Sequence, residues 1–404
     1  MMRSFNSRKP KKPLYQSHYR EPGSFGLGRR NPMGRHHKTI DPARFVNKAI
    51  RAEGAEVFIP QHQFEDFRID RRLVSAAKSR GYLAPTPIQD RIIPLAIEGS
   101  DVVGIADTGT GKTAAFLLPL INKILRNPRE KVLIVAPTRE LAIQIDWEFK
   151  QFTRGMRIFS VCCVGGASIG GQISELRRNY NLIVGTPGRI KDLAGRRMIN
   201  LSSFNSAVLD EADRMFDMGF INDTRLIMSG LPRDRQTFFF SATISHNIEK
   251  IIREFTKNPA MVSIKTRDTS QNVEQDIIRV GQGRSKLDIL NELLGRKELN
   301  KVLIFGRTKH GVEKLSRILQ RNGFRVESIH GNKSNSQRQK ALGMFKDNRI
   351  RILVATDVAA RGIDVADISH VINYDTPSTY EDYIHRIGRT GRWNKMGAAF
   401  TFVD

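Results

Sequence analysis

The sequence has 404 residues, which is long for one domain and comfortable for two at about 100–200 residues each. Hydrophobic residues make up 40% and aromatic residues 8%, so the chain can form cores and wholesale disorder is excluded. The formal net charge of +25 makes a polyanion the first partner to consider, and a basic surface that only keeps the protein soluble is the alternative.

The cysteine content and the hydropathy pattern exclude two further classes of protein. The two cysteines, Cys162 and Cys163, are adjacent in an apolar run, which excludes a mutual structural disulfide and a zinc-binding set and fits a reducing compartment. No apolar run approaches the roughly 18–20 residues that are needed to span a bilayer. We therefore expect a soluble, cytoplasmic protein that does not associate with membranes.

The N-terminal part, residues 1–60, is predicted to be a flexible basic arm. Residues 1–50 contain twelve Lys and Arg against only Glu21 and Asp41, are rich in Gly and Pro, and show no hydrophobic period. The arm holds +10 of the charge, so residues 51–404 keep +15 and are basic as well. Such a segment attracts the phosphates of nucleic acids, and a tail that only aids solubility is the alternative.

From about residue 61, short apolar runs alternate with helical stretches. The first series of predicted strands is Val102–Ala106, Val132–Ala136, Leu182–Val184, Ala207–Leu209 and Thr237–Phe240, with helices that include Arg139–Phe152 and Ile173–Asn179. The second series is Val302–Phe305, Val326–Ile329, Ile352–Ala355, Val371–Tyr374 and Ala399–Val403. Continuous apolar strands that alternate with helices are typical of a parallel sheet covered on both faces.

A polar stretch, Lys265–Asn272, lacks an apolar period and is the predicted linker between the two series. The sequence thus predicts two tandem α/β domains, residues 61–264 and 273–404, each built on a parallel sheet. Ligands of such sheets bind beyond the carboxyl ends of the strands. The motifs described next follow directly on apolar runs, so we expect them at those edges.

A P-loop follows the first predicted strand, with Ala106 in place of the first glycine of the usual pattern. It consists of Ala106, Asp107, Thr108, Gly109, Thr110, Gly111, Lys112 and Thr113. Its glycines let backbone N–H groups approach phosphates, and the N-terminus of the following helix adds a favourable dipole. We expect Lys112 to reach the β- and γ-phosphates of a nucleotide and the Thr113 hydroxyl to bind Mg²⁺.

An acidic sequence, Asp210-Glu-Ala-Asp213, follows the predicted strand Ala207–Leu209. A carboxylate at a strand end, one crossover from a P-loop, holds Mg²⁺ and its waters, and the next carboxylate can polarise the attacking water. We assign the first role to Asp210 and the second to Glu211. In isolation these residues could be the exposed acidic start of a helix, but with the P-loop they indicate nucleotide hydrolysis.

These motifs, in this order, resemble the DEAD-box family of ATP-dependent RNA helicases over about residues 64–404, and the compact chain looks like a bacterial member. The resemblance implies two RecA-like domains. The adenine-reading element of the family appears as Gly81–Gln89 (GYLAPTPIQ), and the aromatic residue Phe64 lies seventeen positions before it. The resemblance implies that Gln89 binds the adenine edge and that Phe64 stacks on the ring. A buried Gln that caps a helix is the alternative for Gln89.

The resemblance also implies an RNA track on the first domain. The residues that match the family there are Pro137, Thr138, Arg139, Gly166, Thr186, Pro187, Gly188 and Arg189. Hydroxyls, guanidinium groups and helix-terminal N–H groups suit contacts to phosphate and 2′-hydroxyl groups, which position a strand without reading its sequence. Asp213, Ser241 and Thr243 are expected to couple the ATP site to the RNA site.

In the second domain the resemblance implies further RNA contacts, from Thr308, Thr356, Asp357, Arg361 and Gly362. It places Asp364 near the ribose, and it makes His385 and Arg386 a bridge between the domains. Arg389 and Arg392 should enter the ATP site as arginine fingers, because a guanidinium against the γ-phosphate stabilises charge in the transition state.

The predicted function is RNA-dependent hydrolysis of ATP to ADP and phosphate, with Mg²⁺, coupled to local RNA unwinding or to remodelling of RNA–protein complexes. The catalytic set is Lys112, Asp210, Glu211, Arg389 and Arg392. The partner is RNA, single-stranded or in short duplexes, with weak sequence preference. An ATP-gated RNA clamp with little unwinding activity is the first alternative, and a DNA helicase of the wider superfamily is the second.

Overall fold

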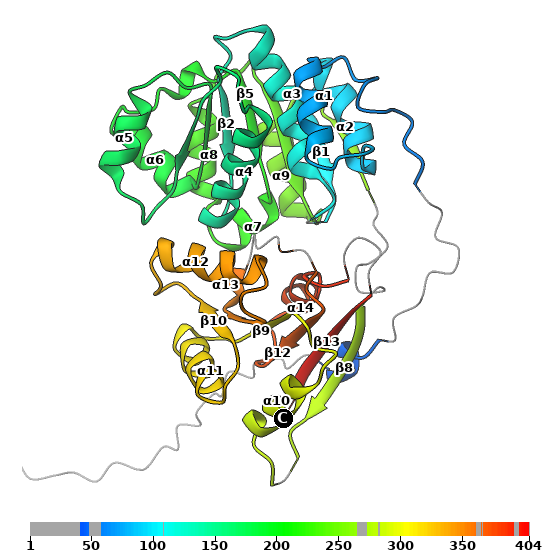
Figure 1. Cartoon of the computed structure of the whole chain (residues 1–404). Coiled ribbons are helices and arrows are strands. Elements are labelled where there is room, and N and C mark those ends of the chain that lie inside the picture. Colours follow the sequence, from blue (N-terminus) through cyan, green and yellow to red (C-terminus); the bar gives the residue numbers. More distant parts are fainter. Residues whose placement is uncertain are drawn as a thin grey trace, which may run out of the picture. The chain divides into compact units, whose positions relative to one another are not determined.

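Two α/β domains, each built on one parallel sheet, make up the computed structural model (Figure 1). The structure describes residues 41–47, 58–107, 109–264, 273–281, 283–360, 365, 367–391 and 396–403. The predicted linker, residues 265–272, and most of the predicted arm lie outside this described part. Within the described residues, no helix is long and apolar enough to cross a membrane.

The first domain has a seven-stranded sheet in the order β3-β4-β2-β5-β6-β1-β7, in which all neighbouring strands are parallel. Its strands are β1 (Val102–Ile105), β2 (Val132–Val135), β3 (Ser160–Cys163), β4 (Leu182–Gly185), β5 (Ser206–Leu209), β6 (Gln236–Ser241) and β7 (Ala260–Ser263). Its helices are α1 (Arg71–Ser79), α2 (Pro87–Ile97), α3 (Lys112–Arg126), α4 (Arg139–Phe152), α5 (Ile169–Leu176), α6 (Pro187–Gly195), η2 (Leu201–Ser203), α7 (Ala212–Asp217), α8 (Ile221–Ser229) and α9 (His246–Phe255).

The second domain has a six-stranded sheet in the order β10-β11-β9-β12-β13-β8, again with parallel neighbours. Its strands are β8 (Val273–Arg279), β9 (Val302–Phe305), β10 (Val326–Ile329), β11 (Ile352–Ala355), β12 (His370–Asn373) and β13 (Gly397–Val403). Its helices are α10 (Lys286–Gly295), α11 (Lys309–Arg321), α12 (Asn335–Lys346), α13 (Asp357–Ala360) and α14 (Tyr380–Ile387).

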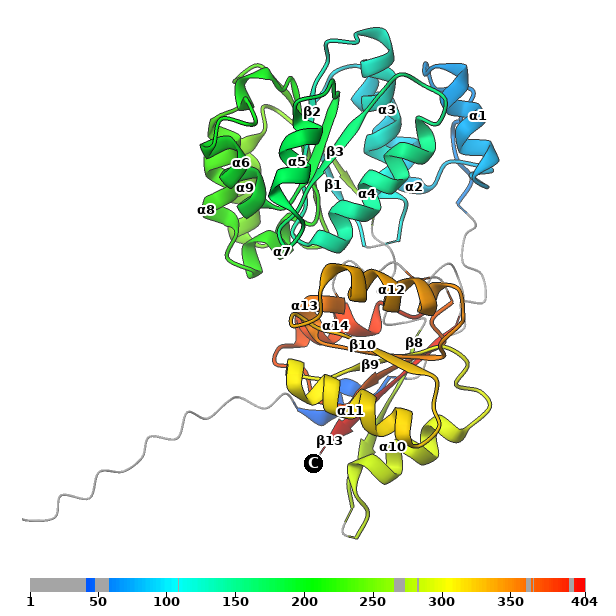
Figure 2. The same ribbon diagram turned by 60° about the vertical axis from the view of Figure 1, so that its left-hand side comes forward.

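Each sheet is buried on both faces, which explains why its strands read as continuous apolar runs. In β2, Val132 and Ile134 join a core with α1 to α4, whereas Leu133 and Val135 join a core with α5 to α9. The second sheet repeats this arrangement, with α12 to α14 on one face and α10 and α11 on the other (Figures 1 and 2). The predicted parallel sheets, covered on both faces, are therefore confirmed.

The structure adds three strands, β3, β7 and β8, that the predicted series did not include. Two further local details differ from the sequence prediction. Helix α5 begins at Ile169 rather than at Ile173, because Ser168 accepts a hydrogen bond from the N–H of Gly171 and starts the helix through a pair of glycines. The second difference lies in the predicted arm, where Pro42–Phe45 forms the short 3₁₀ helix η1 and packs against the second sheet. Local pattern did not reveal either feature.

Candidate active site

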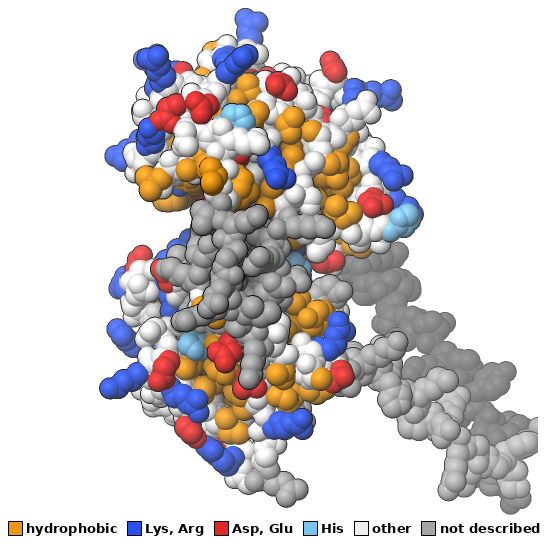
Figure 3. All heavy atoms as spheres, turned by 90° about the vertical axis from the view of Figure 1, so that its right-hand side faces the viewer, with side chains coloured by type: hydrophobic (Ala, Val, Ile, Leu, Met, Phe, Trp, Pro, Cys, Tyr) orange, Lys and Arg blue, Asp and Glu red, His pale blue; other side chains and the backbone are white. Residues whose placement is uncertain are grey.

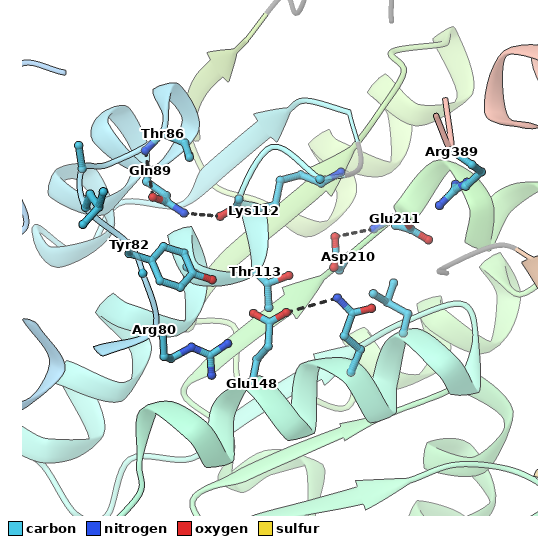
Figure 4. A pocket seen from close by; sticks show the side chains of 18 residues that line it. Arg80, Tyr82, Thr86, Gln89, Lys112, Thr113, Glu148, Asp210, Glu211 and Arg389 are labelled. Carbon is cyan, nitrogen blue, oxygen red and sulfur yellow. Dashed lines mark hydrogen bonds between the residues drawn. The ribbon is translucent and has the colours of Figure 1, made fainter. Parts of the chain in front are cut away.

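A cavity of about 490 Å³ lies at the carboxyl edge of the first sheet (Figure 4). Its lining combines the P-loop, the Gly81–Gln89 element, the acidic pair, one face of α4 and Arg389 of the second domain. The residues are Arg80, Gly81, Tyr82, Leu83, Ala84, Thr86, Gln89, Gly109, Gly111, Lys112, Thr113, Ala114, Leu141, Gln144, Glu148, Asp210, Glu211 and Arg389. Segments more than 100 residues apart in the sequence therefore meet in one site, and the P-loop and the acidic pair reach it from strand ends, as predicted.

The P-loop places Lys112 at the first position of α3, where only 6% of the side chain is exposed. Its Nζ donates to the Ala106 carbonyl at 2.8 Å, and an ammonium group has two further donors for phosphate oxygens. Gly111 has φ of 95°, and a Cβ there would lie 2.5 Å from Nε2 of Gln89. Glycine is therefore required at this position both by the backbone and by its neighbour. Thr108 lies outside the described residues.

Gln89 is fully buried and connects the Gly81–Gln89 element to the P-loop. Its Oε1 accepts from the N–H of Thr86 at 3.0 Å, and its Nε2 donates to the Gly111 carbonyl at 3.1 Å. Gln89 therefore caps helix α2, as the alternative expectation had it, and it also contacts the P-loop. An amide has two donor hydrogens and two acceptor lone pairs, so Gln89 can still present one of each to a base.

The structure places Phe64 in the core of the first domain rather than on the cavity. Phe64 is fully buried, and its ring packs edge-on against Phe67 and Tyr82. Tyr82 is the aromatic residue that lines the cavity. Beside it, the Arg80 guanidinium carbon lies 4.7 Å from the ring centroid of Phe152. Arg80 could not be identified from the sequence, because an arginine just before a turn glycine carries no signal of its own.

Asp210 and Glu211 follow β5 directly and are almost completely buried, with 3% and 4% of their surface exposed. Asp210 accepts from the N–H of Glu211 at 3.0 Å. Burial raises the pKa of Asp210 to about 6, with Lys112 opposing the shift and Glu211 adding to it. Two adjacent buried carboxylates are a site that a divalent cation would stabilise, and oxygen ligands are those that Mg²⁺ prefers.

Glu211 occupies the left-handed region of backbone conformation, with φ of 52° and ψ of 51°, at the start of α7. This conformation is unusual for a non-glycine residue and is often found at functional sites. Its carboxylate forms a buried ion pair with Arg214, at 2.7 Å between Oε2 and Nη1. Arg214, which sequence analysis did not single out, thus fixes the residue expected to orient the attacking water.

The expected coupling residues of the first domain lie in contact. Oδ2 of Asp213 accepts from the N–H groups of Ala242 and Thr243, at 2.9 and 3.1 Å, and lies 3.3 Å from the Thr243 hydroxyl. Burial alone would raise the pKa of Asp213, but Lys112, Arg214 and the Ala242 N–H together lower it below the ordinary value. The acidic sequence and the end of β6, where Ser241 donates to the Thr243 carbonyl, therefore share one network.

The residues predicted to contact RNA in the first domain follow β2, β3 and β4, and most of them line a second cavity of about 430 Å³. The lining members of this set are Pro137, Thr138, Arg139, Thr186, Gly188 and Arg189. A Cβ on Gly166 would overlap the guanidinium of Arg139, so glycine allows the arginine to cross this turn. Arg189 donates to Oε1 of Gln172 at 2.9 Å, which fixes its position at the same edge.

In the second domain, Thr308 caps α11 and Asp357 begins α13, both directly after strands of the sheet. Arg386 donates to both oxygens of Asp357, at 2.6 and 2.8 Å, and to the Asp375 carbonyl at 2.7 Å. We expected Arg386 to bridge the domains, but these contacts all lie within the second domain.

Arg389 is buried, donates to the His385 carbonyl at 3.2 Å and lines the nucleotide cavity. Arg361, Gly362, Asp364 and Arg392 lie outside the described part of the chain.

Two family models match the chain: DEAD/DEAH box helicase over residues 86–251, and Helicase conserved C-terminal domain over residues 285–394. The ATP-dependent RNA helicase CshA of Listeria monocytogenes is 44% identical over 344 residues, which cover 85% of this chain and 66% of that protein. The DEAD-box ATP-dependent RNA helicase CshA of Bacillus subtilis is 44% identical over 84% of this chain and 69% of its own length. The chain thus spans about two thirds of these relatives.

Solved structures resemble the chain over both domains. Saccharomyces cerevisiae Dbp5 bound to RNA and ADP BeF3 matches with a TM-score of 0.75 and 30% identity, covering 84% of this chain and 89% of that one. Mss116p bound to single-stranded RNA and AMP-PNP matches with a TM-score of 0.76 and 27% identity, covering 86% and 77%. These similarities confirm the predicted fold of two RecA-like domains.

Proposed function

Since the chain belongs to the DEAD-box family of ATP-dependent RNA helicases, which hydrolyse ATP, we propose that its hydrolysis is RNA-stimulated, Mg²⁺-dependent and coupled to local RNA unwinding or RNA–protein remodelling. The observation that carries the proposal is the single cavity lined by the P-loop, the Gly81–Gln89 element and the acidic pair. Adenine, phosphate and water each have a candidate partner there.

ATP binding is assigned to three parts of the cavity. Gln89 presents its remaining donor and acceptor to the adenine edge, and the P-loop N–H groups and Lys112 receive the phosphates. Thr113 and Asp210 would hold Mg²⁺, which would neutralise charge on the phosphates. Stacking of Phe64 on adenine stays a prediction. Its ring is buried in the core and does not line the cavity, so the structure does not support this role. Asp364 is proposed to approach the ribose.

Hydrolysis is assigned to Glu211, with the arginines of the second domain as partners. Glu211 accepts a hydrogen bond from the attacking water and orients it in line with the γ-phosphate. Arg389 and Arg392 stabilise the charge that develops on the transferred group, since a guanidinium fork matches phosphate oxygens. Because they belong to a different domain from the P-loop, we expect fast hydrolysis only when RNA binding brings the domains together.

RNA is proposed to lie across the carboxyl edges of both sheets, where Arg139, Arg189 and Thr308 offer donors. Backbone contacts of this kind favour RNA through its 2′-hydroxyls and give weak sequence preference. Positive charge on the face shown in Figure 3 is scattered among acidic side chains rather than gathered in one patch.

The adjacent free thiols of Cys162 and Cys163 fit a reducing compartment, so we propose that the protein acts in the cytoplasm.

The proposal is tested by measuring phosphate release with and without Mg²⁺, using no nucleic acid, single-stranded RNA, and DNA of equal length and sequence. We expect turnover to require Mg²⁺ and to be stimulated by RNA far more than by DNA. Equal stimulation by DNA would contradict the RNA assignment. A parallel assay of strand release from a short RNA duplex separates an unwinding enzyme from an ATP-gated clamp, which would hydrolyse ATP and hold RNA without releasing strands.

A further inference from the structure

A short segment of the predicted arm, Asp41–Asn47, is built into the second domain. Asp41 caps η1 by accepting from the N–H of Ala43 at 3.0 Å, and Pro42 occupies the first helical position, where its fixed φ suits the turn. Phe45, the last residue of η1, is fully buried in the core of the second sheet. Figure 1 shows the segment in blue beside β8. The arm therefore contains one apolar anchor.

Several independent contacts fix this anchor. The rings of Phe45 and Tyr383 have centroids 4.7 Å apart, and the Arg44 guanidinium carbon lies 4.0 Å from the ring centroid of Tyr380. The N–H of Asn47 donates to the Gln275 carbonyl at 3.0 Å, and the N–H of Gln275 donates to the Asn47 carbonyl at 2.8 Å. The segment thus adds an antiparallel bridge to β8, the last strand at that edge of the sheet.

Tyr383 connects the anchor to α14. Its hydroxyl donates to Oε1 of Gln275 at 2.9 Å and lies 3.5 Å from the Phe45 carbonyl. An exposed edge strand and a tyrosine hydroxyl both need hydrogen-bond partners, and the anchor meets both needs at once. The seven residues of Asp41–Asn47 thus make three kinds of contact with the second domain: a buried ring, a pair of main-chain hydrogen bonds and a cation–π contact. An incidental surface contact would not combine all three.

The covalent consequence is a second connection between the domains. The structure describes the chain again from Phe58, which lies on the N-terminal side of α1. Phe58 is eleven residues after Asn47, so the distance between the two residues is at most about 40 Å. The linker from Ile264 to Val273 has nine steps and extends to at most about 32 Å. A domain held by two tethers has fewer accessible positions and orientations than a domain held by one.

We propose that Asp41–Asn47 is an intramolecular anchor that ties the N-terminal side of the first domain to the second domain, so that two tethers limit domain separation. This proposal rests on the proposed function, in which RNA and ATP bring the domains together. The second tether raises the effective concentration of one domain at the other, and therefore lowers the RNA concentration needed for closure. Turnover at saturating RNA does not depend on it.

The test lengthens the tether without touching the anchor. Twenty Gly and Ser residues are inserted between residues 52 and 53, which increases the connector from ten residues to thirty. The effective concentration falls with about the 3/2 power of length, so we expect the KM for RNA to rise by up to about fivefold. The kcat at saturating RNA should stay within about twofold.

A second pair of variants removes the anchor itself. Phe45→Ala empties the apolar contact, and Asn47→Pro removes the N–H that pairs with Gln275. Both should raise the KM for RNA as the insertion does. Phe58→Ala is the matched control, because Phe58 is an exposed phenylalanine on the other side of the connector and should leave the KM unchanged. Arm charge is the same in all of these proteins.

Domain separation is read directly from energy transfer between dyes on Leu226→Cys and Lys297→Cys, one exposed position in each domain, without ATP or RNA. The insertion should broaden the distance distribution while the melting temperature stays unchanged. An insertion protein with the wild-type distribution and the wild-type KM overturns the anchor proposal, even if Phe45→Ala destabilises the second domain. If wild type shows no RNA-stimulated turnover, the proposed function fails, and the dye distances still decide the anchor.

Discussion

The carboxyl edges of the two sheets are built alike and carry opposite chemistry. The first edge holds a glycine loop, one buried lysine and two adjacent buried carboxylates, Asp210 and Glu211. At the second edge, Arg386 is held by Asp357, and Arg389 is buried beside it. The first edge therefore holds the groups that we propose for the nucleotide and Mg²⁺, and the second holds Arg389, a proposed arginine finger. Under this proposal, one reaction uses groups from both domains.

The same contrast appears in the acids of the two domains. Burial raises the pKa of Asp210 to about 6, whereas a hydrogen bond from His330, with Ser328 and other partners, lowers the pKa of Glu313 to about 2. A carboxyl group with a raised pKa lacks partners for its charge in the protein, and a bound cation would provide one. A carboxylate with a lowered pKa is already fully partnered. Asp213, at the same edge as Asp210, has a lowered pKa because Lys112, Arg214 and the Ala242 N–H stabilise its charge, so the raised pKa distinguishes Asp210 from its own neighbour as well as from Glu313.

The largest effect is expected at the first edge. Glu211→Gln removes the carboxylate that we propose orients the attacking water, and it should lower turnover at saturating RNA by about 10²–10³-fold, while ATP binding stays near wild type. Lys112→Ala should instead weaken ATP binding, because it removes a phosphate contact. Phosphate release and binding of a fluorescent ATP analogue separate the two. Glu254→Gln, the same change at an exposed glutamate of the same domain, is the control, and a wild-type rate for Glu211→Gln would remove Glu211 from the mechanism.

A comparable but smaller effect is expected from the second domain. Arg392→Lys keeps the charge but loses the planar fork that can contact two phosphate oxygens, so turnover should fall by about a hundredfold. ATP-dependent RNA affinity should fall much less, because other residues line the RNA track. Both are measured on the same protein, with the exposed Arg317→Lys as control. Equal loss of turnover and affinity would mean that Arg392 holds the domains together rather than stabilising charge.

Much of this arrangement could be predicted from the sequence. The P-loop and the acidic pair follow apolar runs, and parallel strands bring such positions to one edge, so the meeting of Lys112 with Asp210 follows from topology. Long-range burial could not be read in this way. Phe45 stands in a basic arm with no hydrophobic period, and Phe64 follows the family pattern yet is fully buried beside Tyr82. The burial of each phenylalanine depends on residues far away in the sequence, against which its ring packs.

Arg214 shows a second limit of sequence analysis. A cation one residue after an acidic sequence is most simply explained as a solvated helix side chain, yet Arg214 is buried and paired with Glu211. The pairing arises because Glu211 adopts a left-handed conformation that turns its carboxylate toward the first turn of α7. Backbone strain of this kind at a single residue leaves no pattern in the sequence, so only coordinates show it.

A smaller effect is expected from the positive charge of the N-terminal arm, which lies outside both sheet edges. Deletion of residues 1–40 removes ten Lys and Arg but keeps the anchor Asp41–Asn47, so it isolates the arm's charge. RNA affinity should fall, and the slope of log affinity against log salt should become shallower, by about 2 if three of these cations contact phosphates of single-stranded RNA. Turnover at saturating RNA should not change. An unchanged slope would mean that the arm does not contribute to RNA binding.

The smallest effect is expected at Glu313, on the scaffold side of the comparison. Its carboxylate lies 3.0 Å from Nε2 of His330 and accepts from the Ser328 hydroxyl at 2.7 Å. Because the folded pKa is about 2 and the ordinary value is 4.5, the charged form stabilises the fold above pH 4.5, and this stability is lost as the pH falls through 4.5 toward 2. The side chain is partly exposed, so solvent screening reduces the effect to about 1 kcal/mol.

Glu313→Gln should therefore lower the melting temperature of the second domain at pH 7, with the difference from wild type shrinking between pH 5 and pH 3. Glu292→Gln is the control, since Glu292 pairs with Arg284 in solvent and an exposed pair contributes little stability at either pH. A difference that persists undiminished at pH 3 would show that Glu313 acts through packing rather than through its charge.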